Sequence, residues 1–102
     1  MPGVGKLLKQ AQKMQKAMEA VQADLSAKEI EVSSGGGAVK VVVDGHGAVK
    51  SLKLDGEFLK EGAEVVESAI LEAINEACAK AKSESEAEMS KITGGFSMPG
   101  LF

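Results

Sequence analysis

The sequence has few aromatic residues and no arginine. Three of its 102 residues are Phe and none is Trp or Tyr, so the hydrophobic core must consist of aliphatic residues, Ala and Met. All twelve basic residues are Lys. A lysine is a point charge and lacks the guanidinium fork that reads guanine through two parallel hydrogen bonds. Any binding of nucleic acid is therefore expected to be mainly independent of base sequence.

Cysteine and histidine are also nearly absent. Cys78 is the single Cys and His46 the single His, which excludes an intrachain disulfide and a His cluster for a metal. We expect Cys78 at the edge of a buried helical stripe, and His46 exposed in a turn between two glycines. The sequence offers no convincing set of catalytic residues, so we predict a protein that is not an enzyme and has no metal or cofactor.

Long hydrophobic runs are missing as well. No stretch approaches the ~20 apolar residues that cross a bilayer, and we expect no signal peptide and no membrane partner. Apolar residues make up 44% and charged residues 26% of the chain, as is usual for a soluble globular protein. We predict one domain over residues 1–102 in the reducing cytoplasm. A core of this size is modest, which favours self-association.

The charges that are present are segregated along the chain. The net charge is −3, yet residues 1–28 hold five Lys and only two acids, whereas residues 61–102 hold three Lys and eight acids. Whole-protein charge argues against a nucleic-acid partner, but this asymmetry leaves such a partner open.

Residues 6–27 are predicted to form a long helix with two stripes. Apolar residues recur at alternating spacings of four and three, which is the pattern of a helix that packs against another helix. A row of lysines recurs on nearly the opposite side, and no acid precedes Glu19. The apolar seam consists of Leu7, Ala11, Met14, Met18, Val21 and Leu25, and the basic row of Lys6, Lys9, Lys13 and Lys16.

Residues 29–54 are predicted to form three short antiparallel strands. The two turns are Gly35-Gly36-Gly37 and Asp44-Gly45-His46-Gly47, because glycine tolerates the positive φ of tight turns. The glycine triplet lacks the spacing of a phosphate-binding loop and no helix follows it, so we interpret it as a hairpin turn. In the third strand we expect Leu52 and Leu54 to face the core.

A second long helix is predicted over residues 63–93, after a connection in which Phe58 and Leu59 tuck under the sheet. Its stripe weakens past Ala81, and Gly94-Gly95 is expected to cap it. Residues 94–102 form an apolar tail that we expect to return towards Val4 and Leu7. The two helices would lie antiparallel, with Met14 and Met18 packed over a row of small residues. That row is Ala69, Ala73, Ala77 and Ala81.

The whole chain resembles the YbaB/EbfC family of bacterial nucleoid-associated proteins. The resemblance is carried by Leu8-Lys9-Gln10-Ala11-Gln12-Lys13-Met14-Gln15, by Gly35-Gly36-Gly37-Ala38-Val39-Lys40-Val41, by Gly45-His46-Gly47 followed by Val49, and by Thr93-Gly94-Gly95 with Pro99-Gly100-Leu101-Phe102. It implies a tweezer-like cytoplasmic homodimer with helical arms that binds DNA, associates with the nucleoid and catalyses no reaction. The family's DNA contacts are attributed to the arms, and only the first helix here is basic.

Together these features predict an α+β homodimer with the order α-β-β-β-α. We expect Lys6, Lys9, Lys13 and Lys16 to contact phosphates of double-stranded DNA, with no small-molecule substrate. The residues alone favour interpreting the same lysines as the solvated outer face of a coiled coil, and the family resemblance favours DNA contact. The competing class is a cytoplasmic protein-interaction scaffold or holdase that uses the helical arms and the apolar tail.

Overall fold

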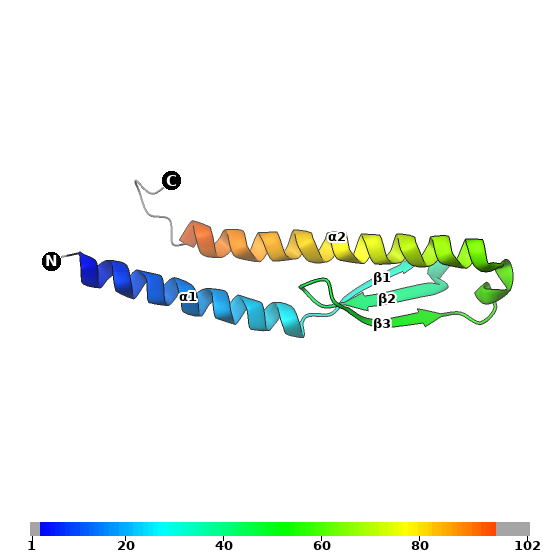
Figure 1. Ribbon diagram of the computed structural model, residues 1–102, viewed down its shortest axis with the longest axis horizontal. Helices are drawn as coiled ribbons and strands as arrows, with labels where there is room; N and C mark the ends of the chain where they lie inside the picture. The colour runs from blue at the N-terminus through cyan, green and yellow to red at the C-terminus, as the bar shows by residue number, and fades with distance from the viewer. Residues whose placement is uncertain (1–2, 96–102) are drawn as a thin grey trace.

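The computed structural model describes residues 3–95 and confirms the predicted order of elements (Figure 1). The helices and strands are α1 Val4–Ala27, β1 Ile30–Ser34, β2 Val39–Val43, β3 Val49–Leu54 and α2 Ala63–Gly95. Short 3-10 turns, η1 Gly35–Gly37 and η2 Phe58–Glu61, lie between them. Helix α1 begins two residues before the predicted start. Helix α2 includes Gly94 and Gly95, which were predicted to end it, and the predicted fold-back of Phe96–Phe102 lies outside the described residues.

The molecule is long and narrow, with extents of 71 × 23 × 15 Å. Helix α2 runs along most of it: its first part covers one face of the sheet, and its last part lies antiparallel to α1 (Figure 1). We call the sheet and residues 63–81 of α2 the body. We call α1 and residues 82–95 of α2 the arm.

The body contains the hydrophobic core. The strands are antiparallel in the order β1-β2-β3, and Val32, Val41 and Leu52 lie side by side across them. Val39, Val41 and Val43 of β2 have no exposed surface, and Ala73 and Ala77 of α2 have none either. Valine suits a pleated, buried strand, and alanine lets a helix approach that strand closely.

The alanine row of α2 therefore faces the sheet. Ala69, Ala73, Ala77 and Ala81 belong to one cluster with residues of β1 and β2. Our prediction that Met14 and Met18 pack over this row was wrong. The periodicity identifies an apolar face of α2, but it does not say whether a helix or a sheet covers that face.

Strand β3 is less covered than predicted. Leu52 and Leu54 lie opposite Val41 and Val39, on the face of the sheet that packs against α2. Helix α2 contacts mainly β1 and β2, so Leu52 and Leu54 remain 44% and 36% exposed. Leu59 is 52% exposed and does not tuck under the sheet, whereas Phe58 packs against the core as predicted.

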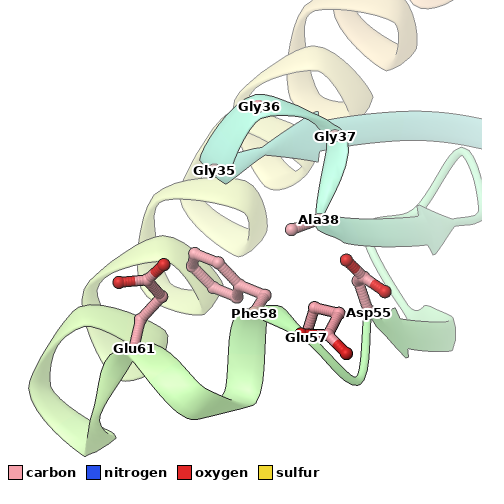
Figure 2. A pocket seen from close by; sticks show the side chains of 8 residues that line it. All are labelled: Gly35, Gly36, Gly37, Ala38, Asp55, Glu57, Phe58 and Glu61. Carbon is pink, nitrogen blue, oxygen red and sulfur yellow. The ribbon is translucent and has the colours of Figure 1, made fainter.

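The glycine triplet forms the turn between β1 and β2 (Figure 2). Gly35, Gly36 and Gly37 all have positive φ, from 60° to 93°, a backbone conformation that residues other than glycine rarely adopt. A Cβ on Gly35 would also meet the ring of Phe58 at 3.1 Å. Ser34, next to the turn, donates a buried hydrogen bond to the Ala69 carbonyl of α2. The turn thus holds the sheet to α2 at the end remote from the arm.

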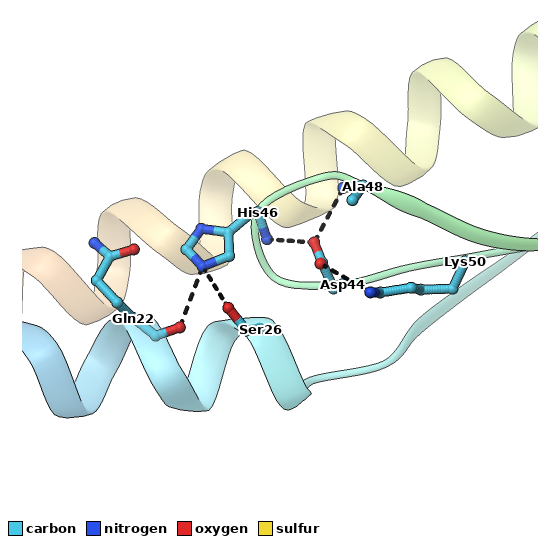
Figure 3. Close-up of polar contacts among 6 residues, drawn as sticks. All are labelled: Gln22, Ser26, Asp44, His46, Ala48 and Lys50. Carbon is cyan, nitrogen blue, oxygen red and sulfur yellow. Dashed lines mark hydrogen bonds and ion pairs between the residues drawn. The ribbon is translucent and has the colours of Figure 1, made fainter.

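The other turn, between β2 and β3, joins the body to the arm (Figure 3). The Gly45 N–H donates to the Leu25 carbonyl at 2.7 Å. His46 Nε2 lies 3.2 Å from the Gln22 carbonyl and 3.1 Å from Ser26 Oγ. Leu25 and Ser26 belong to the last turn of α1, where carbonyl groups lack partners within the helix. The hairpin therefore caps α1, and exposed His46 has specific contacts that the sequence analysis did not assign to it.

Asp44 organises this turn from within. Its Oδ1 accepts hydrogen bonds from the N–H groups of His46 and Ala48, and its Oδ2 lies 3.6 Å from Lys50 Nζ. The hydrogen bond from Ala48 is the main cause that holds the pKa of Asp44 below its usual value. Burial opposes this shift, while the His46 N–H and the Lys50 charge add to it.

Candidate nucleic-acid interface

The basic row of α1 is fully presented to solvent. Lys6, Lys9, Lys13 and Lys16 are all exposed. Within residues 3–95, none of them forms an ion pair with a carboxylate. These ammonium groups are therefore available to an external anion. At 1.5 Å per residue they span about 15 Å along α1, a length of duplex that carries roughly nine phosphate charges.

Helix α1 presents three faces. The face with reduced exposure, which lies against α2, contains Gln10, Met14, Ala17, Val21 and Leu25. At about 100° per residue, the centre of the basic row also lies about 100° from the centre of this face. An apolar strip lies on the other flank, about 175° from the lysines. The apolar strip consists of Val4, Leu7, Leu8, Ala11 and Met18, all exposed.

The contact between α1 and α2 differs from the predicted seam. Met14, Val21 and Leu25 of that seam are covered, but Leu7 is 53% and Met18 37% exposed. Our prediction that Leu7, Ala11, Met14 and Met18 hold α1 against α2 was wrong for Leu7, Ala11 and Met18. The arm segment of α2 offers chiefly Met89 and Ile92 as apolar partners, which is too little surface to cover a whole heptad seam.

Among residues 3–95, no acid of the arm forms an ion pair with the basic row. Glu84 lies 3.3 Å from Lys28, at the end of α1 next to the body, and Glu88 lies 3.3 Å from Lys91 of its own helix. These contacts pair acids of α2 with lysines outside the basic row. The arm therefore carries a cationic α1 beside an acidic segment of α2.

The described residues offer no competing metal site, and the hollow beside the glycine triplet is not suited to a phosphate. Residues 3–95 contain no group of three or more His, Cys, Asp or Glu side chains that could hold a metal ion. The hollow beside the glycine triplet is lined by Asp55, Glu57 and Glu61 (Figure 2), and their charges would repel a phosphate. In the same part of the chain, no helix is long and apolar enough to span a membrane.

The fold and the exposed lysines define a small α+β protein with a cationic helical arm. The model of the YbaB/EbfC DNA-binding family matches residues 1–96, and the chain belongs to this family. The family resemblance noted from the sequence is thereby confirmed.

Curated relatives agree with this assignment, and a solved structure shares the fold. A nucleoid-associated protein of Alkaliphilus metalliredigens is 44% identical, with 99% of this chain and 90% of that protein aligned. One of Ruminiclostridium cellulolyticum is 48% identical, with 94% and 85% aligned. The crystal structure of an uncharacterized Helicobacter pylori protein superposes with a TM-score of 0.77 at 21% identity, covering 85% of this chain and 92% of that one. This last likeness concerns the fold alone.

Proposed function

We propose that this protein is a non-enzymatic, nucleoid-associated protein of the cytoplasm that binds double-stranded DNA. Lys6, Lys9, Lys13 and Lys16 contact backbone phosphates, and the protein acts as a homodimer with two such arms. The observation that carries the proposal is the row of four exposed lysines with no ion-pair partner among residues 3–95. Family membership supports DNA as the anion.

Binding through phosphates predicts a strong dependence on salt. Eight lysines per dimer that each neutralise one phosphate give a slope of log K against log salt of about −7. Because lysine does not read bases in a bidentate way, duplexes of different sequence should bind with similar affinity. Fluorescence anisotropy with labelled duplexes, titrated at several salt concentrations, measures both properties.

The site assignment is tested by reversing charge on the arm. The triple variant K9E/K13E/K16E should lower affinity by at least about 100-fold at 0.1 M salt and flatten the salt slope. The control K60E/K80E/K91E makes the same change in net charge at other exposed lysines and should bind much better than the arm variant. If the arm variant binds like the parent while circular dichroism shows an intact fold, the assignment is wrong.

The proposed dimer is supported by an open apolar surface on the body. Cys78 Sγ lies 4.0 Å from the Gly47 carbonyl, so the flank of α2 that carries Cys78 borders the β2–β3 hairpin. Half-buried Ile70 and Ile74 lie towards the same flank at about 100° per residue. With Leu52 and Leu54 they leave apolar surface that a second copy of the chain would cover.

The oligomeric state tests this surface. The variant L52E/L54E should be monomeric in sedimentation velocity, because a dimer would bury its carboxylates. The control L8E introduces a charge at an exposed leucine of the arm and should remain dimeric. A dimeric L52E/L54E protein would exclude this surface.

A protein-interaction scaffold is the second candidate, and the exposed apolar strip of α1 is the observation that favours it. Leu7 and Leu8 are 53% and 59% exposed and lie next to the other exposed apolar residues of the strip. A scaffold that uses this strip and the tail would bind its partner even in high salt, and would lose it on truncation after Gly95. DNA binding through lysines would survive that truncation.

A further inference from the structure

The outer face of the sheet carries two exposed lysines in addition to the basic row of α1. Helix α2 covers only one face of the sheet, so side chains alternate between buried and more exposed positions along β1 and β2. Lys40 of β2 is exposed on the outer face, and Lys53 of β3 lies directly opposite it in the register. Ser33 of β1 completes this row across the sheet.

This arrangement is unfavourable for an isolated protein. Directly opposed residues of antiparallel strands have Cβ atoms about 4.5–5.5 Å apart, and like charges at such positions destabilise the sheet. Among residues 3–95, neither Lys40 nor Lys53 forms an ion pair. The third lysine of these strands, Lys50, differs because it lies 3.6 Å from Asp44.

The nearby acids leave both lysines without an ion pair among residues 3–95. Lys40 and Lys53 line a shallow hollow with Gly37, Ala38, Leu54 and Asp55. Asp55 is the acid of this hollow, and Glu31 of β1 lies on the same face, diagonal to Lys40. Among residues 3–95, neither acid forms an ion pair with Lys40 or Lys53. The pair therefore resembles the basic row of α1 in the two properties that matter for an anion: exposure and the absence of an ion-pair partner within the described residues.

We propose that Lys40 and Lys53 form a second DNA-backbone contact, on the body of the molecule. This inference rests on the proposed function, because two surface ammonium groups are too few to retain a free phosphate ion. A duplex that is already held by α1 presents further phosphates at high effective concentration. The outer face stays free in the proposed dimer, since Leu52 and Leu54 belong to the opposite face of the sheet.

The first test removes both charges. The variant K40Q/K53Q should flatten the salt slope by between three and four per dimer and weaken binding about 10-fold or more at 0.1 M salt. The control K60Q/K80Q removes two exposed lysines elsewhere and should change affinity and slope much less. The urea midpoint of K40Q/K53Q should equal or exceed that of the parent, because mutual repulsion is removed. A purely structural role for the pair would instead lower that midpoint.

Reversing the charge of one lysine gives a second test, in which stability and affinity for DNA should change in opposite directions. In K40E the new carboxylate lies opposite Lys53, so the urea midpoint should rise while affinity for DNA falls. If K40E and K40Q/K53Q both bind DNA with the parent's affinity and salt slope, the second contact is refuted. The arm variant K9E/K13E/K16E separates the two proposals: its weak binding beside unchanged K40Q/K53Q binding would refute only the contact on the body. Normal binding by the arm variant would refute the assignment of the basic row.

Discussion

The body and the arm use the same helix, α2, in different ways. In the body, Ala73 and Ala77 are fully buried against valines of β2. Among the described residues of the arm, Leu25 and Ile92 are the hydrophobic residues that are buried. The apolar strip of α1, from Val4 to Met18, is exposed. Packing thus stabilises the body, whereas the arm leaves both charged and apolar side chains available. One continuous helix can therefore supply a buried packing surface in one region of a protein and exposed, potential binding surfaces in another.

The largest contrast is expected from adding volume to α2. Ala77→Leu should lower the free energy of unfolding by about 3 kcal/mol, because three extra carbons must fit against the closely packed β2. Ala87→Leu, the same substitution at an exposed position of the arm, should change it by less than about 0.5 kcal/mol. Urea unfolding followed by circular dichroism measures both values. Equal losses in the two variants would contradict the division into body and arm.

A smaller effect is expected at the junction of the two regions. A Cβ on Gly45 would lie 2.6–2.8 Å from atoms of Leu25, including its backbone, so Gly45→Ala should cost about 2 kcal/mol. Gly56→Ala is the matched control, because no atom lies within 4 Å of its added Cβ. Amide hydrogen exchange sharpens the comparison: G45A should lower protection in α1 more than in β2. Uniform loss across both elements would show that the joint does not separate them.

The smallest effect concerns the acid at this junction and depends on pH. The folded pKa of Asp44 is lowered chiefly by the Ala48 hydrogen bond. Its carboxylate therefore stabilises the fold fully above the unfolded pKa of about 3.9, and this contribution is lost as pH falls through the lower folded pKa. Asp44→Asn should be less stable than the parent near neutral pH and should approach it as pH falls below the lowered folded pKa of Asp44. Thermal unfolding at several pH values tests this, with Asp24→Asn on exposed α1 as the control.

The sequence predicted the order of elements and the exposure of the basic row, because both depend on periodicity within one segment. The helical spacing of Lys6, Lys9, Lys13 and Lys16 places them away from the buried side of α1, whichever element covers that side. The sequence could not show which element of the fold covers each apolar face. The alanines of α2 were assigned to a helix but face a sheet, and Leu52 was assigned to the core but lies beyond the edge of α2.

The role of the β2–β3 turn was also beyond the sequence. Gly45-His46-Gly47 indicated a tight turn, which is correct, but the contacts of Gly45 and His46 with the end of α1 join segments about 20 residues apart. The requirement for glycine at position 45 comes from the nearness of Leu25 rather than from a positive φ. Local turn chemistry therefore does not reveal it.

The unbroken course of α2 has a mechanical consequence. A helix of 33 residues is about 50 Å long, and it cannot bend sharply between body and arm without losing backbone hydrogen bonds. In a dimer joined through the bodies, the spacing between the two arms would accordingly be constant. Its width would be determined by the angle at which the subunits meet, and it would admit ligands of one calibre better than others.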